Sequence, residues 1–323
     1  MNPTNGEQSD KVVDVMKVGV FGAGGVGGYF GARLAQAGAS VHLLARGAHL
    51  AVLREKGIRV VSDNGSIDSK LLATDDPEEI GACDFVLFCV KSTNTREAAE
   101  GLKPLLKEET AVVSLQNGID NEQKIAEIID ETHVVGGLAY ILSTISEPGV
   151  IRHEGTLARV VMGEMDGRNS QRLQWLSNLF TKADVDNAIS DAIDVDLWRK
   201  FAMICATAGM TSAIRLPVGE IRESVEALVM FRRIVEEVIA LALALGIALP
   251  KDTVENIMES VPKLPAEWYS SLHYDMTHGK PMELEALHGT VIRLARKHSV
   301  SVPMSEAIYG ILDPWARRKG HKV

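Results

Sequence analysis

Residues 17–31 read Lys17-Val-Gly-Val-Phe-Gly-Ala-Gly-Gly-Val-Gly-Gly-Tyr-Phe-Gly31, a short apolar run that leads into a glycine-rich turn. The run 17–21 predicts a β-strand, and residues 26–37 predict a helix that stops at Gly38. The turn has the Gly-x-Gly-x-x-Gly spacing of a dinucleotide site, in which the glycines permit a tight turn, a close pyrophosphate and close helix packing. The predicted phosphate-binding loop, which uses free N–H groups at the helix start, consists of Gly22, Ala23, Gly24, Gly25, Val26 and Gly27.

Length and composition indicate a soluble globular protein with room for two domains. The chain has 323 residues, of which 46% are apolar and 24% charged. Its net charge of −9 argues against binding to nucleic acid, because no basic domain is available to neutralise phosphates. A bound anion must therefore be held by local groups.

Several features of the chain predict a cytoplasmic protein that does not interact with membranes. The longest uncharged apolar run, residues 238–249, is shorter than the roughly 20 residues that span a bilayer. Residues 1–15 are polar and acidic, unlike a signal peptide, and are expected to be a disordered extension. Cys83, Cys89 and Cys205 form no Cys-x-x-Cys pair, which fits buried thiols in a reducing compartment.

Residues 16–190 alternate strand and helix patterns, which predicts a parallel, doubly wound sheet covered on both faces. The further predicted strands are residues 41–44, 85–90, 111–115, 134–135 and 157–162, and residues 121–129 are a predicted helix. Such sheets bind ligands at the carboxyl ends of their strands. Four successive strand ends carry glycine or polar residues, namely the glycine loop, Arg46, Lys91 and the pair Asn117-Gly118. We expect them to share one crevice.

Residues 191–323 have no strand-like alternation and are predicted to form a mostly helical second domain. Acidic residues lie at the start of its first predicted helix, where the helix dipole favours negative charge. That helix runs towards Ile214. The other predicted helices are residues 224–245, 252–260, 281–297 and 303–315. The apolar stretch 225–249 is compatible both with packing inside this domain and with a homodimer interface.

Arg46 suggests which dinucleotide is bound. Sites that prefer NAD usually place an acidic residue after the second strand, where it bonds the ribose 2′-hydroxyl. Here that position reads Leu43-Leu44-Ala45-Arg46-Gly47, without an acid. Because a guanidinium pairs well with a phosphate, we expect NADP rather than NAD.

Lys200 is the candidate acid for such a reductase. Hydride transfer to a carbonyl requires a proton donor near the developing alkoxide. Lys200 lies between Trp198 and Phe201 and is followed by an almost uncharged run to Ile214. A lysine on an otherwise apolar helix suggests a function beyond solvation.

The sequence resembles the ketopantoate reductase (2-dehydropantoate 2-reductase) family over nearly all of residues 16–315. The resemblance rests on the order and spacing of several short motifs. These are the glycine loop, Leu44-Ala45-Arg46-Gly47, Phe88-Cys89-Val90-Lys91, Leu115-Gln116-Asn117-Gly118, Pro148-Gly149-Val150, Leu197-Trp198-Arg199-Lys200-Phe201, Ser270-Ser271, Asp275, Met282-Glu283-Leu284 and Gly289.

The resemblance implies an α/β fold with a Rossmann-type NADP-binding domain and an all-helical, 6-phosphogluconate-dehydrogenase-like C-terminal domain. It implies reduction of the keto group of 2-dehydropantoate by NADPH, giving pantoate for pantothenate and coenzyme A biosynthesis. Lys200 matches the family's catalytic lysine, which protonates the substrate oxygen, and Glu283 matches an acid beside it that helps order substrate and cofactor. Ser271 matches a substrate-contacting serine. Lys91 and Asn117 match residues at the nicotinamide end of the cleft, and Asn117 also borders the substrate.

The sequence departs from the family at two positions on the Lys200 helix. The family typically has asparagines four and eight residues after the lysine, where they bond the substrate, but this chain has Ile204 and Ala208. Thr207 and Thr211 lie on roughly the same face and are partial substitutes. We therefore expect a more apolar pocket, which leaves open reduction of a different 2-oxo acid.

Three other interpretations compete with this one. An NADP(H) sensor without turnover needs the glycine loop and Arg46 but not the Lys200–Glu283 pair. A 3-hydroxyacid dehydrogenase also has an interdomain lysine, and the later Ser271 and Glu283 pattern speaks against it. A metal site is not expected, because His273, His278 and His288 lie five and ten residues apart rather than at i, i+4.

Overall fold

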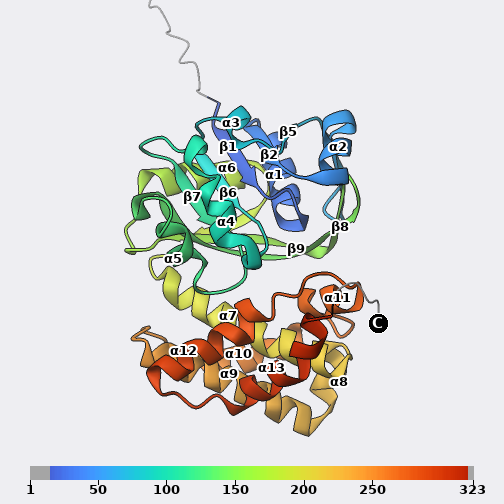
Figure 1. The fold of residues 1–323 in the computed structure, drawn as a ribbon, viewed down its shortest axis with the longest axis vertical. Coiled ribbons are helices and arrows are strands. Elements are labelled where there is room, and N and C mark those ends of the chain that lie inside the picture. Colours follow the sequence, from blue (N-terminus) through green and yellow to red (C-terminus); the bar gives the residue numbers. More distant parts are fainter. Residues whose placement is uncertain (1–14, 319–323) are drawn as a thin grey trace, which may run out of the picture.

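The computed structural model describes residues 15–318, so the predicted N-terminal extension lies, apart from Val15, outside the described residues. Figure 1 shows a sheet-containing half above a helical half, with α7 at the junction between them. The predicted fold class, a Rossmann-type sheet domain followed by a helical domain, is confirmed. Among the described residues, no helix combines the length and apolar character needed to cross a membrane.

The sheet has ten strands in the order β4-β3-β9-β8-β7-β6-β1-β2-β5, with β10 beside β9. Their bounds are β1 Lys17–Phe21, β2 Ser40–Leu44, β3 Ile58–Val61, β4 Ile67–Ser69, β5 Leu72–Thr74, β6 Phe85–Phe88, β7 Ala111–Ser114, β8 Val134–Glu147, β9 Val150–Glu164 and β10 Asp186–Ile189. The central strands β2, β1, β6, β7 and β8 pair in parallel, as predicted.

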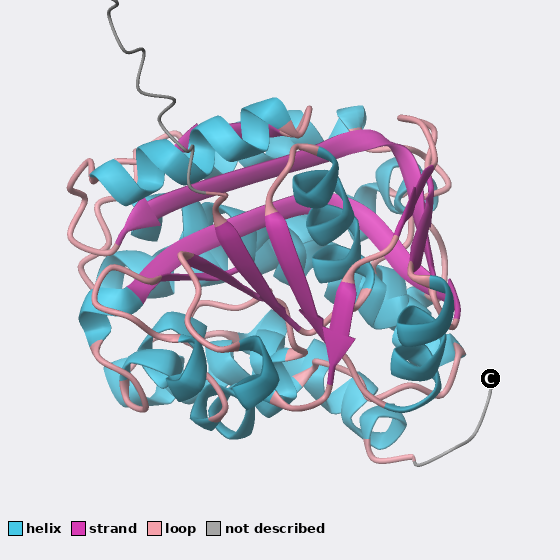
Figure 2. Cartoon of the chain, turned by 90° about the horizontal axis from the view of Figure 1, so that it is seen from above, coloured by secondary structure: helices cyan, strands magenta, loops and turns pink. Residues whose placement is uncertain are grey.

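One side of the sheet departs from the predicted parallel arrangement. β8 and β9 form a long antiparallel hairpin, and β3 and β4 also pair antiparallel. Figure 2 shows the two long strands sweeping across the molecule. Only residues 134–135 and 157–162 of this hairpin were predicted as strand. Its turn-proximal part is half exposed and rich in Ser and Thr, so it lacks the apolar run that marks a buried strand.

The described residues form thirteen α-helices. Helices α1–α6 belong to the sheet half, and α7–α13 build the helical half. Their bounds are α1 Gly25–Gln36, α2 Gly47–Lys56, α3 Pro77–Ile80, α4 Thr95–Glu100, α5 Asn121–Ala126, α6 Gln171–Lys182, α7 Ile193–Ile214, α8 Val218–Glu223, α9 Val225–Ala244, α10 Thr253–Ser260, α11 Ser271–Thr277, α12 Thr290–His298 and α13 Pro303–Ala316. The predicted helix 281–297 is wrong at its start. Residues 281–284 are not helical, and a π-helical turn, Glu285–Gly289, precedes α12.

Each half has its own apolar core. In the sheet half, Phe30 on α1 meets Phe180 on α6 edge-on, with ring centroids 6.0 Å apart. In the helical half, the central helix α7 buries Phe201 and its following apolar residues against α9. Packing of the buried residues along most of this helix fixes the position of Lys200, which lies on its second turn near Tyr140 of β8.

Candidate active site

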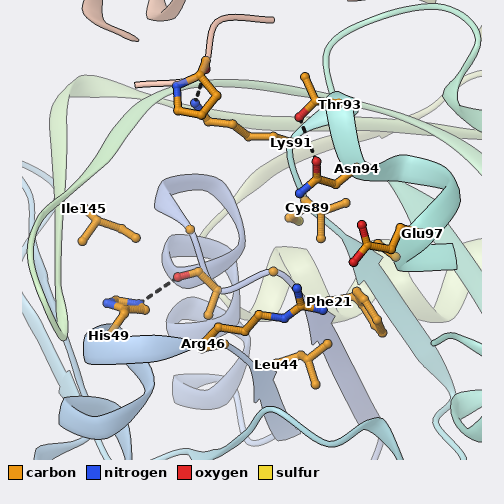
Figure 3. A pocket seen from close by; sticks show the side chains of 17 residues that line it. Phe21, Leu44, Arg46, His49, Cys89, Lys91, Thr93, Asn94, Glu97 and Ile145 are labelled. Carbon is orange, nitrogen blue, oxygen red and sulfur yellow. Dashed lines mark hydrogen bonds between the residues drawn. The ribbon is translucent and has the colours of Figure 1, made fainter. Parts of the chain in front are cut away.

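A pocket of about 410 Å³ lies over the carboxyl ends of β1, β2 and β6. It brings together three of the four predicted strand ends, namely the glycine loop, Arg46 and Lys91 (Figure 3). Asn117, the fourth, does not line this pocket and instead contacts Lys200. The remaining lining residues include His49, Cys89, Thr93, Asn94, Glu97, Ile145 and Pro281.

The glycine loop has the geometry of a phosphate cradle. Gly22 has a φ of +103°, and a Cβ there would lie 2.9 Å from the backbone nitrogen of Val90. A Cβ on Gly27 would lie 2.3 Å from the carbonyl oxygen of Gly22, so the protein's own packing requires both glycines. A Cβ on Gly24 would meet no protein atom within 4 Å, because this residue faces the pocket. Close approach of a ligand accounts for a glycine at that position, and α1 begins there without a side-chain cap.

His49 supports this loop, and sequence reasoning missed it. Its Nδ1 accepts from the N–H of Gly149, so Nε2 carries the proton and donates to the carbonyl oxygen of Ala23 at 2.9 Å. Burial lowers the pKa of His49, which favours this neutral tautomer. The ring thus ties the loop to the β8–β9 turn. Its only sequence signal is a histidine three residues after Arg46, which is too common to be diagnostic.

Arg46 directs an exposed guanidinium into the pocket from the start of α2 (Figure 3). Within residues 15–318 its guanidinium has no hydrogen bond or ion pair with another protein group. Glu97 on α4 lines the same pocket. A free cation beside an uncapped helix start gives this end of the pocket the donors that an anion needs.

Lys91 reaches from the end of β6 to the helical half. Its Nζ lies 2.8 Å from Oδ2 of Asp275 and donates to the carbonyl oxygen of Pro281 at 3.1 Å. Burial raises the pKa of Asp275, while the neighbouring lysine opposes that rise. Lys91 therefore closes one edge of the pocket by joining the two halves.

Lys200 and Asn117 come together although 83 residues separate them in sequence. Nζ of Lys200 donates to Oδ1 of Asn117 at 3.2 Å and lies 5.3 Å from the centre of the Tyr140 ring. Asn117 is held in turn by Asn121, whose side chain donates to its carbonyl oxygen at 3.0 Å. Burial lowers the pKa of Lys200 to about 8, and the charge of Glu122 opposes that effect. This amine is thus close to its titration point near neutral pH.

Glu283 lies in the irregular segment before the π-helical turn, not on a helix. Its Oε1 accepts hydrogen bonds from the backbone N–H of Ser92, at 2.7 Å, and from the Ser92 hydroxyl. No ion pair between Glu283 and Lys200 is present in the described part of the chain. Glu283 is therefore near Lys91, through its neighbours Ser92 and Pro281, rather than bonded to the lysine on α7.

The two serines at the start of α11 have different surroundings. Ser270 is buried, caps the helix and pairs its hydroxyl with that of Thr211 at 2.8 Å. Ser271, the predicted substrate contact, is exposed as the first residue of α11. Its hydroxyl is therefore free for a ligand.

The α7 face beyond Lys200 is apolar, as its sequence predicts. Ile204 is half-buried and Ala208 is buried. Thr207 is also buried, and its hydroxyl donates to the carbonyl oxygen of Met203. Thr211 likewise donates to the carbonyl oxygen of Thr207, so in this structure neither threonine offers the free donor expected of it.

Comparison with known proteins agrees with this architecture. The family model described as "Ketopantoate reductase PanE/ApbA" matches residues 18–167, and "Ketopantoate reductase PanE/ApbA C terminal" matches residues 192–315. The chain belongs to the ketopantoate reductase family. As a member of this family it is an NAD(P)-dependent oxidoreductase that acts on CH–OH groups.

Relatives and solved structures extend over almost the whole chain. The 2-dehydropantoate 2-reductase of Mesorhizobium japonicum is 30% identical, over 94% of this chain and 99% of that protein. The crystal structure of the Geobacter metallireducens 2-dehydropantoate 2-reductase is 29% identical, with a TM-score of 0.86 over 93% of this chain and 99% of that one. D-mandelate dehydrogenase, solved with NADH and anilino(oxo)acetate, shares the fold at 20% identity, with a TM-score of 0.86 over 93% and 98% of the two chains.

Proposed function

We propose that this protein reduces 2-dehydropantoate to pantoate with NADPH, a step of pantothenate and coenzyme A biosynthesis. The observation that carries the proposal is the position of Lys200. Its amine is partly buried, hydrogen-bonded to Asn117 at a strand end, and located where the helical half meets the dinucleotide-binding half. Family membership supplies the reaction class.

The residues of the glycine pocket fit a nicotinamide dinucleotide phosphate. Gly22, Gly24 and the uncapped start of α1 suit the pyrophosphate. The unpaired guanidinium of Arg46 suits a 2′-phosphate, which an NAD-specific site would not need. When bound, the cofactor supplies the hydride that converts the keto carbon to a CH–OH carbon.

Lys200 is the proposed proton donor. The keto oxygen gains negative charge as the hydride arrives, and a neighbouring ammonium both stabilises that charge and transfers a proton to it. A lysine whose pKa is about 8 is largely protonated at neutral pH yet releases its proton far more readily than an exposed lysine. Solvent then returns the proton to the amine. Asn117 holds Nζ in place through its side-chain oxygen.

The remaining residues have supporting roles in this proposal. Glu283 holds the backbone and hydroxyl of Ser92, beside Lys91 at the nicotinamide end, and thereby orders that end of the cleft. Lys91 is positioned to bind an anionic group when the cleft opens, and it closes the cleft through Asp275. Ser271 offers an exposed hydroxyl to the substrate.

A second candidate is reduction of a different 2-oxo acid. Ile204 and Ala208 replace asparagines that would bond polar substrate groups, and the nearby threonines bond their own helix. A substrate hydroxyl that is buried here without a partner costs about 1–3 kcal/mol of binding free energy. This cost disfavours the hydroxylated 2-dehydropantoate relative to an apolar 2-oxo acid. The ligand reported for D-mandelate dehydrogenase indicates that a protein of this fold accepts such a molecule.

NADPH oxidation across a panel of aliphatic, aromatic and hydroxylated 2-oxo acids tests both candidates. If the main proposal is right, 2-dehydropantoate has the highest kcat/KM. An apolar 2-oxo acid that exceeds it by orders of magnitude establishes the second candidate. Tight NADPH binding without turnover on any acid contradicts both and favours a sensor.

A further inference from the structure

Tyr140 on β8 faces Lys200 and has no role in the proposed reaction as described so far. Nζ of Lys200 lies over the face of the Tyr140 ring, 5.3 Å from its centre. The face of an aromatic ring carries partial negative charge and attracts a cation within about 6 Å of the ring centre. The ring is therefore placed to interact with the ammonium form of the lysine rather than with its neutral amine.

The charge of Lys200 has no carboxylate partner at ion-pair distance among the described residues. The preceding residue, Arg199, pairs with Asp196 at 2.7 Å. Lys200 instead donates to the neutral amide oxygen of Asn117 at 3.2 Å. Because burial removes water from an ammonium, the charged form needs other groups in place of that water. The face of the Tyr140 ring is such a group.

The fold holds Tyr140 in place beside α7. Tyr140 pairs with Arg159 across the β8–β9 hairpin. It also packs against an apolar cluster from these two strands and the start of α7, which consists of Leu138, Val161, Ile193 and Leu197. Burial raises the pKa of Tyr140, so its phenol stays neutral near neutral pH. A neutral ring is thus fixed between the hairpin and the lysine.

Charged groups on neighbouring elements also act on the two side chains. The charge of Glu122 on α5 opposes the effect of burial on Lys200. Three charged side chains act on the Tyr140 hydroxyl with effects of both signs, namely Arg199, Asp196 and Arg159. All of these groups are retained when only residue 140 is replaced, so substitutions there isolate the contribution of the ring.

We propose that Tyr140 is a positioning residue for Lys200, whose ring face favours and orients the ammonium. This inference rests on the proposed role of Lys200 as proton donor. An ammonium has three N–H bonds. With one directed to Asn117 and another to the ring, the third is left for the keto oxygen of the substrate. The ring offers the neutral amine no comparable attraction, so it also favours reprotonation of Lys200 from solvent after each turnover.

The test measures the acetylation rate of Lys200 by acetic anhydride against pH, with peptide mass spectrometry as the readout. Only the neutral amine reacts, so the midpoint reports the protonation of Lys200 without requiring turnover. Tyr140→Leu removes the ring, and we expect the midpoint to fall by roughly half to one pH unit. Tyr140→Phe keeps the ring face and should retain a midpoint close to that of the parent protein. Tyr309→Leu removes a ring from α13 and is the control, in which the midpoint should not change.

An unchanged or raised midpoint in a folded Tyr140→Leu protein overturns the inference. A fall in Tyr140→Phe as large as that in Tyr140→Leu also overturns it, because the hydroxyl rather than the ring would then be responsible. Should Tyr140→Leu be insoluble, phenylalanines with increasing numbers of ring fluorines at position 140 keep the shape while they weaken the negative ring face. The midpoint should then fall with each added fluorine, and a constant midpoint across that series overturns the inference.

Activity gives a second reading that separates this inference from the proposed function. The pH profile of kcat/KM on the best 2-oxo acid should shift in the same direction as the acetylation midpoint. If no 2-oxo acid is reduced, the proposed function fails, while the acetylation series still decides whether the Tyr140 ring favours the ammonium of Lys200.

Discussion

Lys91 and Asp275 form an ion pair that joins the two halves of the protein, with Nζ 2.8 Å from Oδ2. The Asp275 side chain is 9% exposed and the Lys91 side chain 41%, so the aspartate depends on the lysine for its compensation. Lys91 also donates to the carbonyl oxygen of Pro281. Lys91, which was predicted at the nicotinamide end of the cleft, thus also connects the two halves of the protein.

Lys91→Met is expected to lower the free energy of unfolding by about 1–2 kcal/mol, because it leaves a buried carboxylate unpaired. Urea denaturation at pH 7 measures the loss, and Lys91→Met with Asp275→Asn should recover part of it. Lys103→Met removes an exposed ion pair and should change little. If Lys91→Met and Lys103→Met are equally stable, the Lys91–Asp275 ion pair contributes nothing to stability.

Arg46→Ala is expected to raise the KM for NADPH by roughly ten- to a hundredfold and to leave that for NADH almost unchanged. A charge-assisted bond to the 2′-phosphate is the physical reason, since only NADPH carries that group. Lys56→Ala, at the exposed far end of α2, is the matched control. Steady-state kinetics with both cofactors measures the effect, and an unchanged ratio of the two KM values would remove Arg46 from cofactor selection.

Lys200→Met is expected to reduce kcat/KM by roughly 10²–10⁴ while raising the free energy of unfolding at pH 7 by about 1–3 kcal/mol. The folded-state pKa of Lys200 lies below its usual value, at about 8. Between about pH 8 and the ordinary lysine pKa of about 10.4, the unfolded chain therefore binds more protons than the folded chain. Below that window, burial of the charged ammonium lowers the stability of the folded protein.

The stability gain of Lys200→Met should therefore be full below about pH 8 and shrink as pH rises through that window. Denaturation at pH 7 and at pH 10 measures the difference. A variant that is less stable than the parent protein at pH 7 would argue against a strained, buried ammonium.

Ile204→Asn is expected to raise kcat/KM for 2-dehydropantoate by about tenfold relative to an apolar 2-oxo acid, because it restores a polar group one turn after Lys200. Ile204 is only half-buried, so an asparagine fits there more readily than at the buried Ala208. Met203→Asn introduces the same amide on the neighbouring position and serves as the control. An equal change for both substrates would show that this position does not discriminate between them.

Local sequence signals account for the central architecture and for most of the pocket beside the glycine loop. The glycine spacing predicted the β1–α1 turn because Gly22 and Gly27 are required by backbone packing wherever this turn occurs. Arg46 and Lys91 could be placed together because parallel strands end at one edge of the sheet. The helix α7 was recognisable from its long uncharged run.

Features that depend on distant partners could not be predicted. The hairpin β8–β9 is stabilised by pairing between its strands, and a Cβ on Gly137 would lie 2.5 Å from the Ser114 carbonyl oxygen, a contact that local sequence does not reveal. Glu283 was expected on a helix beside Lys200, but it lies just before the π-helical turn and bonds to Ser92 instead. His49 supports the glycine loop through contacts that exist only in the folded chain.

A crystal structure of the complex with NADP and a 2-oxo acid tests the central claim most directly. We expect the 2′-phosphate at Arg46 and the keto oxygen within hydrogen-bonding distance, about 3 Å, of Nζ of Lys200. An occupied cleft in which Lys200 stays out of reach of the keto oxygen, and another acid takes its place, would contradict it.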